Sequence, residues 1–453
     1  MVHNDETIVA QATAIGTGSI GVVRVSGGSV AAIAQTILKK KIQPRQAVYT
    51  NFYDQNNNVL DKGIALFFPK PNSFTGEDTL ELQGHGGTIV INMIIESILA
   101  TKKARMAEPG EFSQRSFLNN KMDLAQAEAV VKLINATSKT AAKNAINSVN
   151  GELSKLVNQI KAQIVHLRVQ VEAMIDFPDE DIDVDLTKDK MNTALSQITE
   201  DLNTLINQSE QSSLINDGIK VAIIGKTNAG KSSLLNCLCE HEKAIVTDIE
   251  GTTRDCIDER IIIKGIPITI IDTAGFRKTT DSVEKIGISK SEKIIKEADI
   301  VLYLMDSNKS IAENKIPQHE DLVNCETKKI IFVQNKIDKL CSTTKYKDNT
   351  EQTVYISAKH KQGISKLKDK IAEAAGYQAN IESTFSASAR HVTALKNCLE
   401  HIEETHNHFN SYMMIDLASE ELKLAHDNLG LITGKMHSDE MLGEIFSNFC
   451  IGK

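Results

Sequence analysis

The stretch Gly225–Ser232 reads GKTNAGKS and decides the fold of the central part of the chain. It follows the apolar run Val221–Ile224 and precedes the helix-like run Ser233–Leu238, which is the strand, loop and helix order of a phosphate-binding loop. Glycines let successive backbone N–H groups curl around an anionic phosphate, and the following helix adds its positive dipole end. We expect Lys231 to reach the β- and γ-phosphates and the Ser232 hydroxyl to ligate magnesium.

Two further motifs belong to the phosphate side of such a site. Thr252 and Thr253 offer a switch threonine, for which Thr253 is the expected second magnesium ligand. The motif DTAG, Asp272–Gly275, ends a second apolar strand, Ile268–Ile271, where a magnesium-side carboxylate and a γ-phosphate-sensing glycine belong. The residues expected around the phosphates are therefore Asn228, Ala229, Gly230, Lys231, Ser232, Ser233, Thr252, Thr253, Asp272, Thr273, Ala274 and Gly275.

Two later motifs indicate which base the nucleotide carries. NKID, Asn335–Asp338, closes the strand Ile330–Gln334, and SAK, Ser357–Lys359, follows the strand Thr353–Ile356. A carboxylate at Asp338 can accept hydrogen bonds from both N1–H and the exocyclic amine of guanine, whereas adenine presents no such donor pair. We expect the base to contact Asn335, Lys336, Asp338, Ser357, Ala358 and Lys359. Each motif alone could be ordinary strand-to-turn sequence, but five in this order predict a GTPase.

Length and composition are typical of a multidomain globular protein. The 453 residues suggest about three domains, and contents of 41% hydrophobic and 24% charged residues are ordinary for soluble proteins. The N-terminus lacks the apolar part of a signal peptide and no segment is apolar enough to span a bilayer, so we expect a cytoplasmic protein without a membrane partner. A net charge of −8 argues against general nucleic-acid affinity, so any RNA contact must be local or shared.

The pattern of apolar residues predicts a multidomain α/β protein with an inserted GTPase unit. Residues 1–119 are expected to form an α+β domain, 120–216 a helical region, 217–377 a Ras-like GTPase domain with a doubly wound sheet, and 378–453 a second helical region. Neither helical region has an obvious partner of its own, so we expect one discontinuous bundle. The first domain should contain strands at Thr7–Thr13, Ile20–Ser26 and Gly63–Phe68 and a helix at Val30–Leu38, and the last region helices at Val392–Phe409, Met414–Leu429 and Asp439–Phe449.

Five segments, spread over nearly the whole chain, resemble the MnmE family, also called TrmE, of the TrmE-Era-EngA-like GTPase superfamily. They are NSFTGED (72–78), ELQGHGG (81–87), PGEFS (109–113), DLAQAEA (123–129) and FCIGK (449–453). The resemblance implies a bacterial or organellar tRNA-modification GTPase that forms a homodimer through residues 1–119. It implies work with the flavoprotein MnmG, as a heterotetramer, to add an aminomethyl or carboxymethylaminomethyl group to C5 of the tRNA wobble uridine.

The resemblance also implies that residues 1–119 bind a one-carbon folate, either 5,10-methylene- or 5-formyl-tetrahydrofolate. On the matching positions the folate contacts would be Arg24, Glu81, Lys121 and Lys453. Cations suit the folate carboxylates and a carboxylate suits the pterin N–H groups. The alternative is that Arg24 and Glu81 are ordinary surface charges.

Two groups that assist GTP hydrolysis in Ras-like GTPases, a water-orienting glutamine and an arginine finger, are not apparent in this sequence. The position next to the DTAG glycine, where Ras-like proteins carry the water-orienting glutamine, holds Phe276. The resemblance implies that Glu284 takes this catalytic role, with a helix N-terminal carboxylate as the alternative. No arginine finger is identifiable, and the resemblance implies a potassium ion held by Asn228 and backbone oxygens of the first switch: Thr247, Asp248, Ile249, Glu250, Gly251 and Thr252. Asn228 as a plain turn residue is the alternative.

Two details of the chain remain open at this level. Thr227 replaces the proline usual in the family's phosphate loop, and we expect little effect on nucleotide binding because this side chain points away from the phosphate in most such loops. The tail Phe449–Lys453 either frays as an ordinary chain end or reaches the N-terminal domain, with Lys453 meeting folate and Cys450 the substrate chemistry. The alternative function is a ribosome-assembly GTPase of the Era or Der kind, but those proteins carry a basic RNA-binding module or a second GTPase domain, and neither is apparent here.

Overall fold

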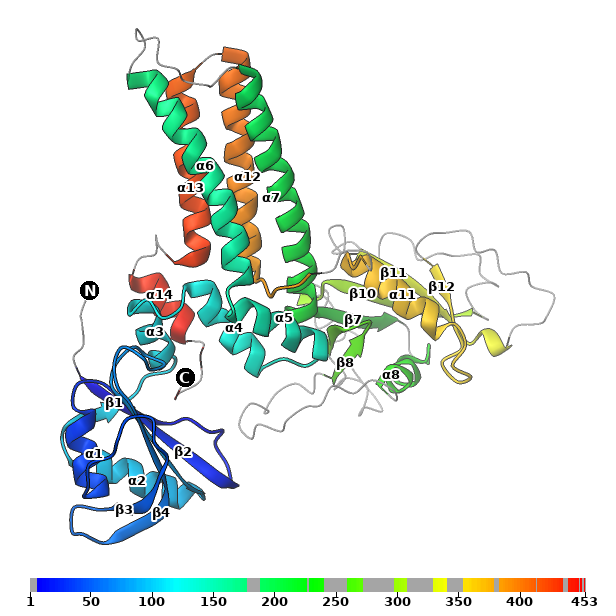
Figure 1. Cartoon of the computed structure of the whole chain (residues 1–453). Helices are drawn as coiled ribbons and strands as arrows, with labels where there is room; N and C mark the ends of the chain where they lie inside the picture. Colours follow the sequence, from blue (N-terminus) through cyan, green and yellow to red (C-terminus); the bar gives the residue numbers. More distant parts are fainter. Residues whose placement is uncertain are drawn as a thin grey trace. The chain divides into compact units, whose positions relative to one another are not determined.

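The protein divides into two compact units, and each contains one six-stranded sheet. The first unit comprises residues 1–131 and 426–453, and the second comprises 132–425. The computed structural model (Figure 1) describes residues 6–176, 188–225, 228–239, 259–271, 297–307, 329–339, 353–378, 383–412, 414–434, 439–447, 449 and 452.

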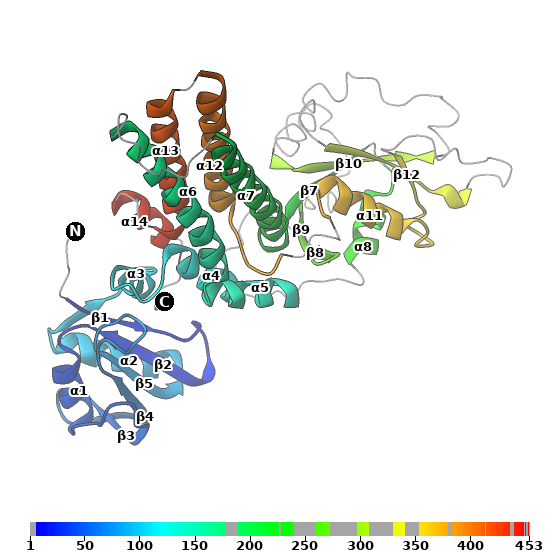
Figure 2. The same cartoon turned by 45° about the horizontal axis from the view of Figure 1, so that its top comes forward.

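The sheet of the first unit has the strand order β3-β4-β5-β2-β1-β6. Its strands are β1 (Thr7–Gln11), β2 (Gly18–Ser26), β3 (Val48–Tyr53), β4 (Val59–Phe68), β5 (Thr79–Gly86) and β6 (Ala104–Met106). Neighbouring strands are antiparallel except β1 and β6, which are parallel. Helices α1 (Val30–Leu38) and α2 (Thr88–Ala100) pack on the sheet, as Figure 2 shows, and bury Ile33 and Ile94 against Val9, Val23 and Leu82.

The alternate residues of β1 belong to a second cluster, with helix α3 (Glu111–Leu118). Ile8 and Ala10 are buried there with Phe112 of α3, whereas Val9 between them belongs to the cluster of α1 and α2. Side chains alternate between the two faces of a strand, so α3 lies on the face opposite α1 and α2.

The C-terminal segment of the chain packs into this same unit. Helix α4 begins at Leu124 (Leu124–Ile134), and α14 (Asp439–Ser447) contributes Leu442 and Phe446 to a cluster with Leu124 and Phe449. Gly110, at φ +69°, leaves no room for a side chain, because a Cβ there would lie 2.4 Å from the Phe446 carbonyl oxygen. The unit is therefore assembled from both ends of the sequence.

The second unit contains a helical bundle whose parts come from both sides of the second sheet in sequence. Its helices are α5 (Lys139–Val149), α6 (Glu152–Asp176), α7 (Lys188–Asp217), α12 (Ala389–Asn407) and the first part of α13 (Ile415–Thr433). Lys396 of α12 pairs with Glu210 of α7 at 2.6 Å, and His401 of α12 pairs with Glu421 of α13 at 2.7 Å. The expected discontinuous bundle is therefore confirmed for these helices (Figure 1). Residues 426–453 were expected in the same bundle but belong to the first unit, because apolar residues of α14 pack against Leu124.

The sheet of the second unit has the order β12-β11-β10-β7-β9-β8. Its strands are β7 (Ile219–Gly225), β8 (Glu259–Ile263), β9 (Ile266–Ile271), β10 (Ile300–Asp306), β11 (Lys329–Asn335) and β12 (Thr353–Tyr355), all parallel except β8. Helices α8 (Lys231–Cys239) and α11 (Ile364–Ala375) pack on one face, where Cys237 and Cys239 are buried. In a parallel sheet the carboxyl ends of the strands meet at one edge, where ligands bind.

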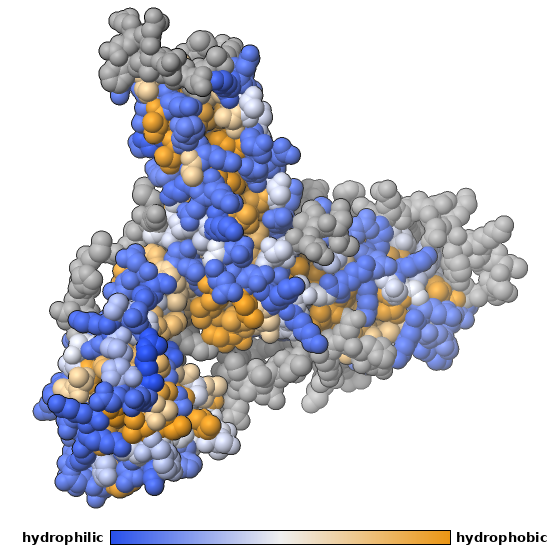
Figure 3. Space-filling model, in the orientation of Figure 1, coloured by the Kyte–Doolittle hydropathy of each residue, from blue (hydrophilic) through white to orange (hydrophobic). Residues whose placement is uncertain are grey.

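The surface of the molecule is mixed in polarity. The face in Figure 3 is largely hydrophilic, with hydrophobic residues visible in separate groups. Within the described ranges, every helix is too short or too polar to cross a membrane.

Candidate functional site: a nucleotide site and a charged sheet face

The phosphate loop follows β7 and leads into α8, as the sequence predicts. Gly225 has φ +146° and Gly230 has φ +100°, conformations that L side chains rarely adopt. A Cβ on Gly225 would lie 2.2 Å from the Leu304 carbonyl oxygen, and one on Gly230 would lie 2.3 Å from the Asn335 amide nitrogen. Both glycines are therefore required by the local packing. Lys231 donates a hydrogen bond back to the Gly225 carbonyl, and its burial lowers the pKa of the ammonium group.

Asn335 ties the phosphate loop to the loop after β12. Its Nδ2 donates to the Ala229 carbonyl at 2.9 Å, and its Oδ1 accepts from the Ala358 N–H at 3.1 Å. The side chain is almost completely buried, and its own carbonyl accepts from the Ser307 hydroxyl at 2.7 Å. The side-chain amide of Asn335 in NKID thus connects the phosphate loop with the SAK motif.

Asp338 lies at the same edge of the sheet, where its carboxylate can accept hydrogen bonds. The Ser357 hydroxyl donates to its Oδ1 at 2.6 Å and holds the pKa of the carboxyl below its ordinary value. His360 lies 4.0 Å from Oδ2, with its side chain about half exposed. The carboxylate is therefore ionised at neutral pH, in the form that can accept the two N–H donors of guanine.

The structure brings together the described part of the predicted nucleotide site. The residues at this edge are Asn228, Ala229, Gly230, Lys231, Ser232, Ser233, Asn335, Lys336, Asp338, Ser357, Ala358 and Lys359. Outside the described residues lie Thr227, Thr247, Asp248, Ile249, Glu250, Gly251, Thr252, Thr253, Asp272, Thr273, Ala274, Gly275, Phe276 and Glu284.

Asn228 itself adopts a left-handed backbone conformation, with φ +64°. Asparagine is among the few residues that tolerate this region, so the turn alone gives a reason for Asn at this position. Its carbonyl accepts a hydrogen bond from the Lys336 ammonium at 2.6 Å. The backbone role does not compete with a cation at the side-chain oxygen.

Arg24 and Glu81, the first two expected folate contacts, are partners of each other. They stand directly opposite on β2 and β5, and the Arg24 guanidinium meets Glu81 Oε1 at 2.9 Å. The guanidinium carbon also lies 5.4 Å from the ring centre of Phe74 and 5.8 Å from that of Phe112, within cation–π range. Each side chain is only about one-fifth exposed.

The remaining folate positions are described in part. Lys121 lies beside Gly76, where an added Cβ would stand 3.2 Å from the Lys121 Cγ. Lys453 and Cys450 lie outside the described residues, but Gly452 between them is buried against the end of β1. A Cβ on Gly452 would be 2.0 Å from the Gln11 carbonyl oxygen. Gln11 follows Ala10, the residue paired with Arg24 across β1 and β2, so Gly452 lies at the end of the strand next to β2.

Comparison with known proteins covers the whole chain. A family model described as "MnmE helical domain" matches residues 124–450, and one described as "GTP-binding protein TrmE N-terminus" matches 7–121. The tRNA modification GTPase MnmE of Psychromonas ingrahamii is 47% identical over 456 residues, with 100% of each chain covered. The chain belongs to the MnmE family, also called TrmE. The MnmE of Vibrio cholerae serotype O1 (strain ATCC 39541) is 46% identical, with 99% of each chain covered.

Among solved structures, the MnmE-family chain matches the G domain of the FeoB iron transporter of T. maritima. The two are 27% identical over 35% of this chain and 98% of that chain, and the TM-score of 0.25 is too low to bear on the fold.

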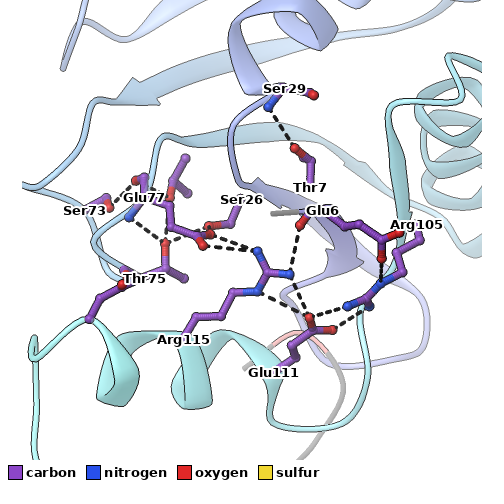
Figure 4. Close-up of polar contacts among 12 residues, drawn as sticks. Glu6, Thr7, Ser26, Ser29, Ser73, Thr75, Glu77, Arg105, Glu111 and Arg115 are labelled. Atoms are coloured by element: carbon purple, nitrogen blue, oxygen red, sulfur yellow. Dashed lines mark hydrogen bonds and ion pairs between the residues drawn. The ribbon is translucent and has the colours of Figure 1, made fainter. Parts of the chain in front are cut away.

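The first unit of this MnmE-family chain holds an ionic network that the motifs did not single out. Arg115 of α3 meets Glu77 at 3.1 Å and Glu111 at 2.8 Å, and it also donates to the backbone carbonyl of Glu6. Arg105 of β6 meets Glu111 at 2.7 Å and Glu6 at 2.8 Å (Figure 4). Glu77 and Glu111 lie in the segments NSFTGED and PGEFS that carry the family resemblance. Their place in these segments is the feature of the sequence that could have indicated the network.

Glu111 is the centre of that network. Burial alone would raise the pKa of its carboxyl, but hydrogen bonds from Arg105, from the Glu108 N–H and from Arg115 outweigh burial and lower it. The bond to Glu111 in turn raises the pKa of Arg105. A network of this kind fixes α3 against β6 and the loop before β5, next to the face that carries Arg24.

Proposed function

We propose that this protein is a GTP hydrolase that works in tRNA modification. The observation that carries the proposal is the meeting of the phosphate loop with Asn335 and Asp338 at one edge of a parallel sheet. The matched relatives, which this chain covers from end to end, are named tRNA modification GTPase MnmE. Guanine is the base whose N1–H and exocyclic amine suit the ionised Asp338.

The described residues fit a magnesium-bound nucleotide. The buried cradle around Gly230 admits no side chain, and the phosphate loop leads into α8 with Lys231 and Ser232 in its first turn. Ser232, with Thr253 of the switch, would hold the magnesium ion, which neutralises charge on the β- and γ-phosphates when bound. Lys231 binds the same phosphates, and Asn335 and Asp338 orient the base.

We propose two further groups for the hydrolytic step. Glu284 orients the attacking water, since Phe276 offers no hydrogen bond at the usual glutamine position. A potassium ion would be held by Asn228 and by oxygens of Thr247, Ile249 and Thr252, and it would supply the positive charge that an arginine finger supplies in other GTPases. Asn228 is exposed at its left-handed turn, which is compatible with this role.

The first unit supports the folate part of the proposal. We propose that residues 1–119 dimerise and bind a one-carbon tetrahydrofolate near Arg24, Glu81, Lys121 and Lys453. The partly buried Arg24–Glu81 pair supports this, because it sets a cation and a carboxylate side by side, with the Arg24 guanidinium near the rings of Phe74 and Phe112. Folate, when bound, would supply the one-carbon unit. Residues 217–377 would form the GTPase domain, inserted between the helical regions 120–216 and 378–453, of which residues 120–131 and 426–453 pack in the first unit.

We propose that the protein acts in the cytoplasm, as a homodimer with MnmG and tRNA as partners. The reaction would place an aminomethyl or carboxymethylaminomethyl group on C5 of the wobble uridine. The decisive experiment deletes the gene and analyses tRNA nucleosides by mass spectrometry. Loss of the wobble-uridine derivatives, restored by the intact gene, is expected. Unchanged tRNA nucleosides together with unprocessed ribosomal RNA would instead identify a ribosome-assembly GTPase.

A further inference from the structure

Two residues at the end of β10 contact the NKID motif, and neither belongs to any of the motifs identified in the sequence. Asp306, the last residue of β10, stands in register with Asn335 at the end of β11. Its Oδ2 meets the Lys336 ammonium at 2.7 Å. The next residue, Ser307, is fully buried and donates its hydroxyl to the Asn335 carbonyl at 2.7 Å.

Asn335 and Lys336 each hold one carbonyl of the phosphate loop. The Lys336 ammonium binds the Asn228 carbonyl at 2.6 Å, and the Asn335 amide binds the Ala229 carbonyl at 2.9 Å. In a planar trans peptide the N–H points opposite to the C=O. The N–H groups of Ala229 and Gly230 therefore point away from these two carbonyl contacts.

This arrangement has a direct consequence for anion binding. A loop of converging N–H groups binds phosphate only while the peptides keep that orientation. Lys336 fixes the first peptide as long as its own ammonium is held in place. Asp306 holds it, with only about one-fifth of the carboxylate side chain exposed to water.

We propose that Asp306, supported by Ser307, is a positioning residue for the phosphate loop. The inference rests on the proposed function, since it assumes that the loop binds a guanine nucleotide. Asp306 acts through Lys336: the carboxylate keeps the ammonium on the Asn228 carbonyl and so keeps the Ala229 N–H aimed at the phosphates. Guanine selectivity stays with Asp338, whose carboxylate is held by Ser357.

The test measures binding of a fluorescent GDP to the full-length protein. Asp306→Asn should raise Kd about tenfold, chiefly through faster dissociation, as expected for coupling within one ion-pair network. Preference for GDP over XDP should not change, and kcat at saturating GTP should stay within about twofold of wild type. The matched control is Asp369→Asn, because Asp369 forms an exposed 2.7 Å pair with Lys264 elsewhere in the domain and its loss should leave Kd unchanged.

A double-mutant cycle separates positioning from a general loss of structure. If Asp306 acts through Lys336, then Asp306→Asn should change Kd less than twofold in a Lys336→Met background. Asp306→Glu, which keeps the carboxylate, should recover most of the affinity and covers the case in which Asp306→Asn folds poorly. Independent, multiplicative effects of the two substitutions, or an unchanged Kd in Asp306→Asn, would overturn the inference. Absence of GDP binding by the wild type would instead refute the proposed function.

Discussion

The Ser357 hydroxyl donates a 2.6 Å hydrogen bond to one oxygen of the Asp338 carboxylate. The contact joins the loop after β12 to the loop after β11, and it stabilises the ionised form of Asp338. A carboxylate with a lowered pKa remains an acceptor throughout the neutral range, so base recognition should not depend on pH there. The second oxygen and the remaining lone pairs stay available to guanine.

Asp338→Asn should therefore change base selectivity. The substitution replaces an acceptor pair with one donor and one acceptor, which suits xanthine better than guanine. Competition between GTP and XTP for the purified variant measures the change. Ser357→Ala is the matched control: it should weaken GTP binding only a few-fold, by loss of one hydrogen bond, and leave the preference for guanine intact. An Asp338→Asn protein that still prefers GTP would show that the NKID assignment is incorrect.

Potassium should stimulate GTP hydrolysis. The reason is the side-chain oxygen of Asn228 in a loop for which no arginine finger or water-orienting glutamine is apparent from the sequence. Turnover should fall sharply when sodium replaces potassium at equal ionic strength, and Asn228→Ala should remove the difference. Because Asn228 has φ +64°, Asn228→Gly is the better control: it keeps the turn and should also lose the response. Equal turnover in the two salts would exclude the cation.

Glu284→Ala should reduce turnover far more than binding. A residue that orients water stabilises the transition state and does not hold the ground-state nucleotide. We expect near-normal GTP affinity with kcat reduced on the order of a hundredfold or more, as for loss of a general base. Single-turnover kinetics with an equilibrium Kd would measure both. Weaker binding with unchanged kcat would favour the other interpretation of Glu284, a carboxylate that stabilises a helix N-terminus.

The ionic network around Glu111 should make the first unit sensitive to acid. The pKa of Glu111 is lowered in the folded protein, so its contribution to stability is present above the ordinary glutamate value of 4.5 and is lost as pH falls through the folded value. Hydrogen-exchange protection of α3 should therefore decline below that pH. Glu111→Gln should be less protected at pH 7, by about 3 to 5 kcal/mol for a broken buried pair, and should decline less on acidification.

The control for this experiment is Glu172→Gln. Glu172 pairs with Arg168 at 2.7 Å on α6, but both side chains are substantially exposed, so its loss should change stability little. A wild-type α3 whose protection does not depend on pH between 5 and 3 would contradict the role given to Glu111.

The sequence predicted the nucleotide site well because that site is built from short local motifs at strand ends. The helix Val30–Leu38 was predicted with the observed bounds, and β7, β9, β11 and α8 within about two residues. Helix α2, IVINMIIESILA after Thr88, was not predicted, since an apolar run of this kind shows no clear helical or strand period. The strands β3, β5, β6, β8 and β10 were also not identified.

Contacts between residues far apart in the sequence could not be predicted from short motifs. The Arg24–Glu81 pair depends on the register of β2 against β5, 57 positions apart, and sequence spacing does not specify that register. The ion pair of Asp306 with Lys336 spans 30 positions and belongs to no motif. For the same reason, the packing of Gly452 on β1 became visible only in the fold.

That packing supports the last prediction, which concerns the tail Phe449–Lys453. Phe449 is buried in a cluster with Phe446 and Leu124, and Gly452 has φ +93° with no room for a side chain against the Gln11 carbonyl. A frayed chain end would make neither contact. Gly452 thus packs at the end of β1, the strand that pairs with β2, which carries Arg24.

We therefore expect that removal of Cys450–Lys453 weakens tetrahydrofolate binding and abolishes tRNA modification while GTP hydrolysis continues. Phe449 is retained in this variant, so the cluster with Phe446 and Leu124 is preserved. Calorimetric folate titration, a GTPase assay and nucleoside analysis test the three expectations separately. The point variants Cys450→Ser and Lys453→Ala then divide the effect: the first should lose modification with folate binding intact, and the second should lose folate affinity. Normal wobble-uridine modification by the truncated protein would exclude the tail from the mechanism.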